Sequence, residues 1–157
     1  MSDTESAIRR QLAEQVQETF ASALNAVTWA LLRQPDRSLL DDEKMLYAAF
    51  ASGYHYLETG TFLEHQRAEW LISRVYAALG NGPEALRHAE RCMDLTTAHR
   101  DQLPDYDKAF AQEALARAHA KAGNTDEAAK FRAEAEQAGN AISDERSRKV
   151  FLEELNT

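Results

Sequence analysis

Residues 76–85, YAALGNGPEA, contain the signals for the end of one helix and the beginning of the next. Gly80 follows a run of alanine and leucine, and glycine is the commonest residue just beyond the end of a helix. Pro83 follows three residues later, and proline is favoured in the first turn of a helix, where its missing N–H has no helical partner to lose. The stretch therefore predicts two antiparallel helices joined by a tight turn.

A stretch of similar sequence, residues 119–128, reads HAKAGNTDEA. Both stretches follow the pattern x-A-x-x-G-N-x-x-E-A, and their glycines, Gly80 and Gly123, lie 43 residues apart. A third window, residues 53–62, has a related order of small residue, aromatic residue and glycine. The internal similarity predicts that helical hairpins recur along the chain.

The remaining chain divides at comparable signals into segments of helix length. Gly60 and Gly139 are expected to end helices, and the proline-bearing residues 101–104 supply a further break. We expect seven helices, which begin near residues 6, 41, 61, 83, 104, 124 and 143. No segment alternates apolar and polar residues between turns, as a half-buried strand does. The fold class expected is therefore all-α, an antiparallel array of about seven helices.

The first expected helix, about residues 6–33, is the longest and carries an apolar stripe. Its large apolar residues recur every three or four positions and so share one helix face: Ile8, Leu12, Val16, Phe20, Leu24, Val27 and Leu31. We expect this helix either to cap the array or to pair with another copy of the chain. An exposed stripe from Ile8 to Val27 predicts a homodimer. We expect Trp29, Tyr47 and Phe50 to pack the first two helices together.

Composition limits the compartment and the classes of partner. The formal net charge is -8 and no run of lysine and arginine offsets it, so we expect no nucleic-acid partner. No stretch approaches the roughly 20 apolar residues of a membrane-spanning helix, and residues 1–5 do not resemble the start of a signal peptide. We therefore expect a cytoplasmic bacterial protein without a membrane partner. Cys92 is the only cysteine and is expected to be a buried, inert thiol.

The length of 157 residues suits one domain. We expect that domain to consist of a long N-terminal helix (1–34), an array of helical hairpins (41–139) and a C-terminal capping helix (143–157).

The densest group of polar and aromatic side chains flanks Gly60, and we expect it to form a binding site. Its members are Tyr54, His55, Glu58, His65, Glu69, Trp70 and Arg74. His55 and His65 are each five residues from Gly60, so an antiparallel hairpin places them at similar heights. Aromatic and arginine side chains dominate protein-binding surfaces, whereas histidine and carboxylate on facing helices build metal sites in bundles. We predict no metal or cofactor, and a small-ligand or metal site around residues 53–74 is the alternative.

Two members of this cluster have structural interpretations as well. Arg74 either clamps a carboxylate of a ligand or forms an ion pair with a nearby acid such as Glu69 or Glu58. Trp70 is of a residue type that packs in a core more often than it forms a ligand platform.

The repeated windows resemble the tetratricopeptide repeat. In that family a small residue, an aromatic residue three positions later and a glycine four positions after that lie along the first helix and its end. Ser73, Tyr76 and Gly80 match those places. Gly53, Tyr56 and Gly60 match them too, and the resemblance covers roughly residues 41–139. The family period is 34 residues, but the glycines here are 20 and then 43 residues apart.

The resemblance, which extends to small bacterial proteins of this type, implies a right-handed superhelix of hairpins with irregular repeat length. Such arrays bind a peptide or a partner's helix on a concave surface. The chain contains no G-x-S-x-G, P-loop, G-x-G-x-x-G or H-E-x-x-H motif. We therefore expect a non-catalytic protein–protein interaction module or adaptor. A small-ligand or metal-binding protein, or an enzyme with its site around residues 53–74, is the alternative.

Overall fold

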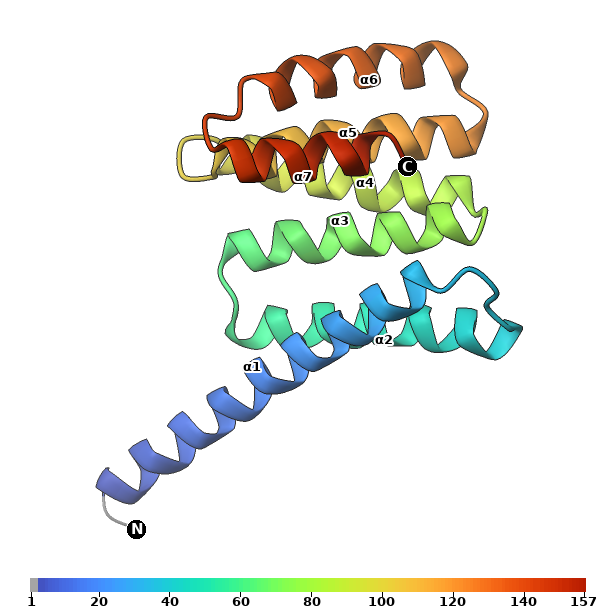
Figure 1. Cartoon of the computed structure of the whole chain (residues 1–157). Coiled ribbons are helices and arrows are strands. Elements are labelled where there is room, and N and C mark those ends of the chain that lie inside the picture. The colour runs from blue at the N-terminus through green and yellow to red at the C-terminus, as the bar shows by residue number, and fades with distance from the viewer. Residues whose placement is uncertain (1–2) are drawn as a thin grey trace. The chain divides into compact units, whose positions relative to one another are not determined.

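A computed structural model describes residues 3–157, and these residues form seven helices and no strand (Figure 1). The helices are α1 (Asp3–Arg33), α2 (Leu39–Thr59), α3 (Phe62–Ala78), α4 (Gly82–Ala98), α5 (Asp105–Ala122), α6 (Thr125–Asn140) and α7 (Glu145–Leu155). The expected all-α class is confirmed. None of the helices in the described range has the length and apolar character needed to cross a lipid bilayer.

The chain groups into two compact units, which are described separately. Unit 1 comprises residues 1–68 and unit 2 residues 69–157, so the boundary falls inside α3. The expectation of a single domain stays a prediction.

Unit 1 is built on the helical hairpin of α1 and α2. Arg37 donates to the carbonyl oxygens of Leu31, Leu32 and Gln34 at the end of α1 and pairs with Asp42 at 2.7 Å. Free carbonyls at a helix end need such partners. This arginine therefore fixes the turn between the two helices.

A capping box begins α2. The backbone N–H and hydroxyl of Ser38 donate to Asp41, while the Ser38 hydroxyl accepts from the Asp41 N–H. These hydrogen bonds favour the ionised carboxyl and hold the pKa of Asp41 below its ordinary value. The stabilisation from this cap is therefore present at neutral pH and is lost as the pH falls through the lowered pKa.

Small residues on the inner face of α2 allow α1 to approach it closely. The buried residues of α2 are Met45, Ala48, Ala49, Ser52 and Gly53. The Ser52 hydroxyl donates to the carbonyl of Ala21 in α1 at 2.8 Å. The prediction that Tyr47 and Phe50 pack between the two helices is wrong, because they lie on the opposite face of α2 and are 64% and 38% exposed. The inner face has room for alanine and serine but not for large rings.

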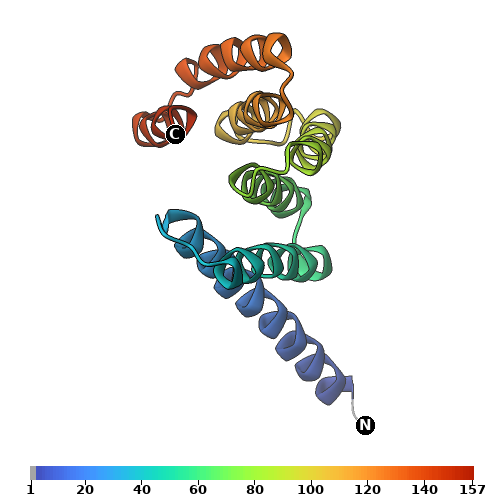
Figure 2. The same ribbon diagram turned by 90° about the vertical axis from the view of Figure 1, so that its right-hand side faces the viewer.

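The N-terminal half of α1 extends past the end of α2 (Figure 1, and in side view Figure 2). From Thr4 to Val16 every residue is exposed except the half-buried Ser6. This part of the helix gains its backbone hydrogen bonds but buries almost no side-chain surface.

Unit 2 contains two helix ends of nearly identical geometry, and they fall in the two windows of similar sequence. Gly80 and Gly123 have left-handed φ angles of 75° and 83°, which suit a residue without a side chain. Asn81 and Asn124 each donate their N–H to the carbonyl five residues earlier, both at 2.9 Å. The recurring sequence pattern therefore builds the same helix termination twice.

The side chains around these two turns also correspond. Tyr76 stacks on His88 with ring centroids 5.6 Å apart and planes at 19°. His119 stacks on Phe131 at 5.3 Å and 3°, again across 12 residues. In both cases the ring four residues before the glycine covers the ring eight residues after it, so the similarity extends beyond the turn.

Two of the glycines expected to be helix breaks, Gly60 and Gly139, do not adopt a left-handed φ angle. They are needed because a side chain at either position would collide with neighbouring atoms. Gly139 lies within α6, and a Cβ there would collide with the ring of Phe151; the expectation that it ends the helix is wrong by one residue. Gly60 does follow α2, but its φ of -79° is open to any residue. A Cβ at Gly60 would lie 2.5 Å from the Tyr56 carbonyl oxygen.

Replacing Gly82 with alanine is expected to lower the free energy of unfolding of unit 2 by about 1–3 kcal/mol. A Cβ at Gly82 would lie 2.5 Å from the Lys121 carbonyl oxygen and 2.6 Å from the Ala122 backbone, which cannot rotate away. The control is Thr125→Ala at the corresponding exposed position of the second turn, expected to change stability by about 0.5 kcal/mol or less. Urea unfolding of both variants measures the difference. A Gly82→Ala chain as stable as the wild type contradicts the close approach of α4 to the end of α5.

Candidate functional site

The seven side chains predicted to form a site belong to two units. Tyr54, His55, Glu58 and His65 lie in unit 1, and Glu69, Trp70 and Arg74 lie in unit 2. The two groups are therefore described in turn.

In unit 1, His55 joins α2 to α1. Its ring stacks on Phe20 with centroids 5.4 Å apart and planes at 21°, and its Nδ1 is hydrogen-bonded to the Gln17 amide oxygen. Tyr54 meets the same imidazole edge-on at 5.6 Å and is 57% exposed. Glu58 is exposed. His55 is thus engaged on one nitrogen by its own chain.

His65 is half-buried, and its Nε2 lies buried without a hydrogen-bond partner among the described residues. A single unpaired nitrogen does not define a metal site. Residues 3–157 contain no group of three or more histidine, cysteine, aspartate and glutamate side chains arranged to hold a metal ion.

In unit 2, Trp70 is buried and its indole N–H donates to Glu113 of α5 at 2.8 Å. Arg117, one turn further along α5, donates its Nε to the other oxygen of Glu113 at 2.6 Å. Arg117 also reaches the carboxylate of Glu154 in α7 at 3.3 Å. Trp70 therefore packs in the core, as its residue type suggested, with its one donor engaged there.

Arg74 completes this network of buried and part-buried charges. Its Nε donates to Glu154 at 2.7 Å, so its acidic partner is on α7 and is neither Glu69 nor Glu58. Two carboxylates, Glu113 and Glu154, face two guanidinium groups, which balances the charge. The network ties α3, α5 and α7 together and leaves Arg74 engaged inside the protein.

The burial of this network shifts the acidity of its members. Burial raises the pKa of Glu113 above its ordinary value, and the Arg117 guanidinium and the Trp70 N–H oppose part of that rise. Burial also raises the pKa of the Cys92 thiol, and the nearby carboxylates of Glu69, Glu113 and Asp107 add to it. A protonated, fully buried thiol is unreactive, so Cys92 offers no nucleophile.

Glu69 is engaged as well, because its carboxylate is 2.6 Å from the Nδ1 of the buried His88. A third arginine, Arg132 of α6, donates to the Leu155 carbonyl and the Asn156 side chain at 2.8 Å each. The polar side chains of unit 2 that were expected at a site thus hold its helices together.

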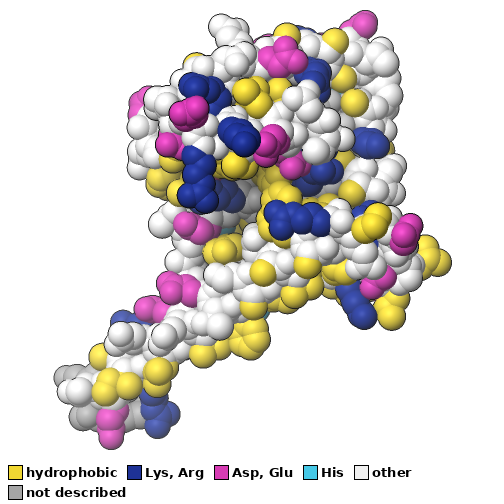
Figure 3. Space-filling view, in the orientation of Figure 1, with side chains coloured by type: hydrophobic (Ala, Val, Ile, Leu, Met, Phe, Trp, Pro, Cys, Tyr) yellow, Lys and Arg dark blue, Asp and Glu magenta, His cyan; other side chains and the backbone are white. Residues whose placement is uncertain are grey.

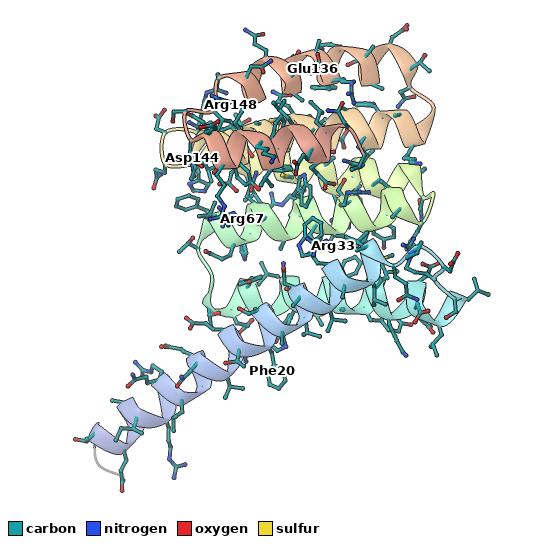
Figure 4. The ribbon with its side chains drawn as sticks, in the orientation of Figure 1. Phe20, Arg33, Arg67, Glu136, Asp144 and Arg148 are labelled. Atoms are coloured by element: carbon teal, nitrogen blue, oxygen red, sulfur yellow. The ribbon has the colours of Figure 1, made fainter. Side chains whose placement is uncertain are left out.

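A different surface of unit 1 stands open, and we name it the α1–α2 face. It consists of eight large apolar or aromatic side chains that are 45–64% exposed: Ile8, Leu12, Val16, Phe20, Val27, Tyr47, Tyr54 and Leu57. Figure 3 shows hydrophobic side chains gathered along the lower edge of α1 and α2, and the ring of Phe20 projects from α1 there (Figure 4). The exposed side chains of the two helices adjoin at His55, which contacts both Phe20 and Tyr54.

Only part of the α1–α2 face can be predicted from the sequence. The sequence predicts the α1 stripe and places Tyr54 in the expected binding site. The spacing of Tyr47, Tyr54 and Leu57 also follows the helical period. α2 is apolar on two faces, and the small residues rather than the large ones face α1.

Comparison with protein-family models, with curated proteins and with solved structures finds no match to this chain.

Proposed function

We propose that this chain is a non-catalytic protein-interaction module, an adaptor whose partner docks on the α1–α2 face. The observation that carries the proposal is the size of that face. At roughly 100 Å² of open surface for each half-exposed large side chain, its eight side chains together expose on the order of 800 Å² along the two helices. The largest apolar patch on a typical monomer is about 300–600 Å². Larger patches mark surfaces that bind another macromolecule.

The chemistry of the face favours a helical partner with an apolar stripe. The open side chains of α1 recur every four residues from Ile8 to Phe20, which is the spacing by which amphipathic helices engage each other. The side chains that define the face are rings and aliphatic chains without a basic group, so they offer an anionic ligand no ion pair. A partner helix with its own apolar row fits best.

We further propose that α3 to α6 form tetratricopeptide-like hairpins in a right-handed superhelix of irregular repeat length. The matched turns at Gly80 and Gly123 and their matched ring pairs support this proposal. The repeat then serves as the scaffold of the adaptor.

Photo-crosslinking in the native cell tests the proposed function. A benzophenone amino acid replaces Val16 on the face, and in the matched control it replaces Glu14, which lies two residues away on the opposite side of α1. We expect a protein adduct from position 16 and little from position 14, because only the former contacts a docked helix. The absence of an adduct from position 16, or equal adducts from both, contradicts the proposal.

A further inference from the structure

We infer that the helix that docks on the α1–α2 face is α1 of a second copy of this chain, and that the two copies pair antiparallel. This inference rests on the proposed function and specifies its partner. The residues at the centre of the pairing are Ile8, Leu12, Val16 and Phe20.

The free half of α1 has the composition of a helix that packs against another helix. Between residues 3 and 20, the large apolar residues are those four and no others, and all fall in one row of every fourth position. Each is 51–56% exposed, although an exposed helix segment of this length needs packing for stability. A row this regular, with nothing in its own chain to cover it, indicates a partner.

The opposite side of the same segment carries the charges. Arg10, Glu14 and Glu18 also recur at every fourth position, and a shift of two residues places them about 200° around the helix from the apolar row. The positions beside the row are mostly uncharged: Gln11, Gln15 and Thr19 on one side, and Ala13 and Gln17 on the other. Glu5 and Arg9 are the exceptions, and antiparallel pairing about the centre of the row places them opposite the uncharged Ala23 and Thr19. Two copies with a net charge of -8 each can therefore meet along the row without opposing carboxylates.

The row is self-complementary in the antiparallel orientation. A twofold interface brings one patch against itself, and a twofold axis between Leu12 and Val16 places these two residues opposite each other. The same axis places Ile8 of each copy opposite Phe20 of the other. Because both copies use the same patch, the contact closes as a dimer and does not propagate.

The α2 part of the face favours this orientation over a parallel one. Phe20 stacks on His55, and Tyr54 meets the same imidazole edge-on, so a second α1 that reaches Phe20 with its Ile8 lies next to these two rings of α2. In a parallel pair, the free N-terminal half of each α1 would lie along the same half of the other copy. The rings of Tyr54 and His55 would then stay uncovered. At roughly 100 Å² for each half-exposed side chain, the row and Tyr54 contribute on the order of 500 Å² per copy, or about 1,000 Å² for the pair, which is the lower bound for a specific interface.

Molar mass in solution tests the inference. We expect the purified full chain to sediment at twice its 17.6 kDa mass. Leu12→Glu is expected to raise the dissociation constant at least about 100-fold, because a charge replaces a buried leucine twice in each dimer. The matched control, Ala7→Glu, adds the same charge to the free half of α1 on the other side and is expected to stay dimeric. Both positions are exposed within one chain, and equal helix content by circular dichroism verifies that the variants fold.

The outcomes separate the inference from the proposed function. A wild-type monomer at every concentration, together with a position-16 adduct to a different protein, overturns the second copy and leaves the adaptor standing. A monomer with no adduct overturns both. A dimer that survives Leu12→Glu uses another surface and overturns the inference.

Disulfide trapping tests the orientation. Antiparallel pairing predicts that a mixture of Leu12→Cys and Val16→Cys chains cross-links far more under mild oxidation than either variant alone. In that arrangement identical positions are offset along the axis by about 6 Å, beyond the Cβ separation of a disulfide. The natural Cys92 is buried and does not compete. Efficient cross-linking of Leu12→Cys alone indicates a parallel pair and overturns the antiparallel arrangement.

Discussion

Replacing Glu113 with alanine is expected to lower the free energy of unfolding of unit 2 by about 3–5 kcal/mol. Glu113 is 2% exposed and accepts from both Trp70 and Arg117. Alanine leaves the indole N–H without an acceptor and a largely buried guanidinium short of one carboxylate. Urea unfolding followed by Trp70 fluorescence measures the loss, in a Trp29→Phe background so that the signal comes from unit 2.

Two further variants separate the network from ordinary surface charge. Glu127 on α6 pairs with Lys130 at 3.6 Å, with about half of each side chain exposed, and Glu127→Ala should cost about 1 kcal/mol or less. Glu113→Gln keeps an acceptor for Trp70 but loses the charge, so it should lie between the wild type and Glu113→Ala. If the Glu113 and Glu127 alanine variants lose equal stability, the buried network is not what holds these helices.

Replacing Phe151 with alanine should cost about 3–5 kcal/mol, the range for deleting a buried aromatic ring. Phe151 is fully buried, packs edge-on against Phe110 at 4.9 Å, and fills the space left by the missing side chain of Gly139. Gly139 has no side chain that could move into the cavity. α7 is therefore expected to loosen from unit 2 before the other helices unfold.

The control for Phe151 is the residue beside it. Val150 is 45% exposed, and Val150→Ala should stay within about 0.5 kcal/mol of the wild type. Hydrogen exchange of α7 amides, read by mass spectrometry, is expected to accelerate in Phe151→Ala and not in Val150→Ala. Equal exchange in both variants contradicts the role assigned to Phe151.

The helices could be predicted from the sequence because their ends depend on neighbouring residues. Gly80 and Gly123 adopt the left-handed conformation that a helix end requires, and a few adjacent positions determine that outcome. Gly139 could not be assigned correctly, because its role depends on Phe151, which approaches it only in the folded chain.

The partners of the predicted site residues were beyond local reasoning for the same reason. Arg74 meets Glu154 across 80 residues, and Trp70 meets Glu113 across 43. No spacing rule along a helix connects such positions. The orientation of α2 is a related case, since Tyr47 and Met45 both fit an apolar face and only packing against α1 shows which one is buried.

The long separation between Arg74 and Glu154 has a consequence for synthesis. A ribosome that adds about 5–20 residues per second needs roughly 4–16 s to extend the chain from one residue to the other. During that time α3, α4 and α5 can emerge and pack, while Arg74 and Arg117 still lack the carboxylate they share. Until α7 is made, the two guanidinium groups in the nascent unit 2 outnumber the single carboxylate of Glu113. Unit 2 therefore reaches its full stability only late in translation.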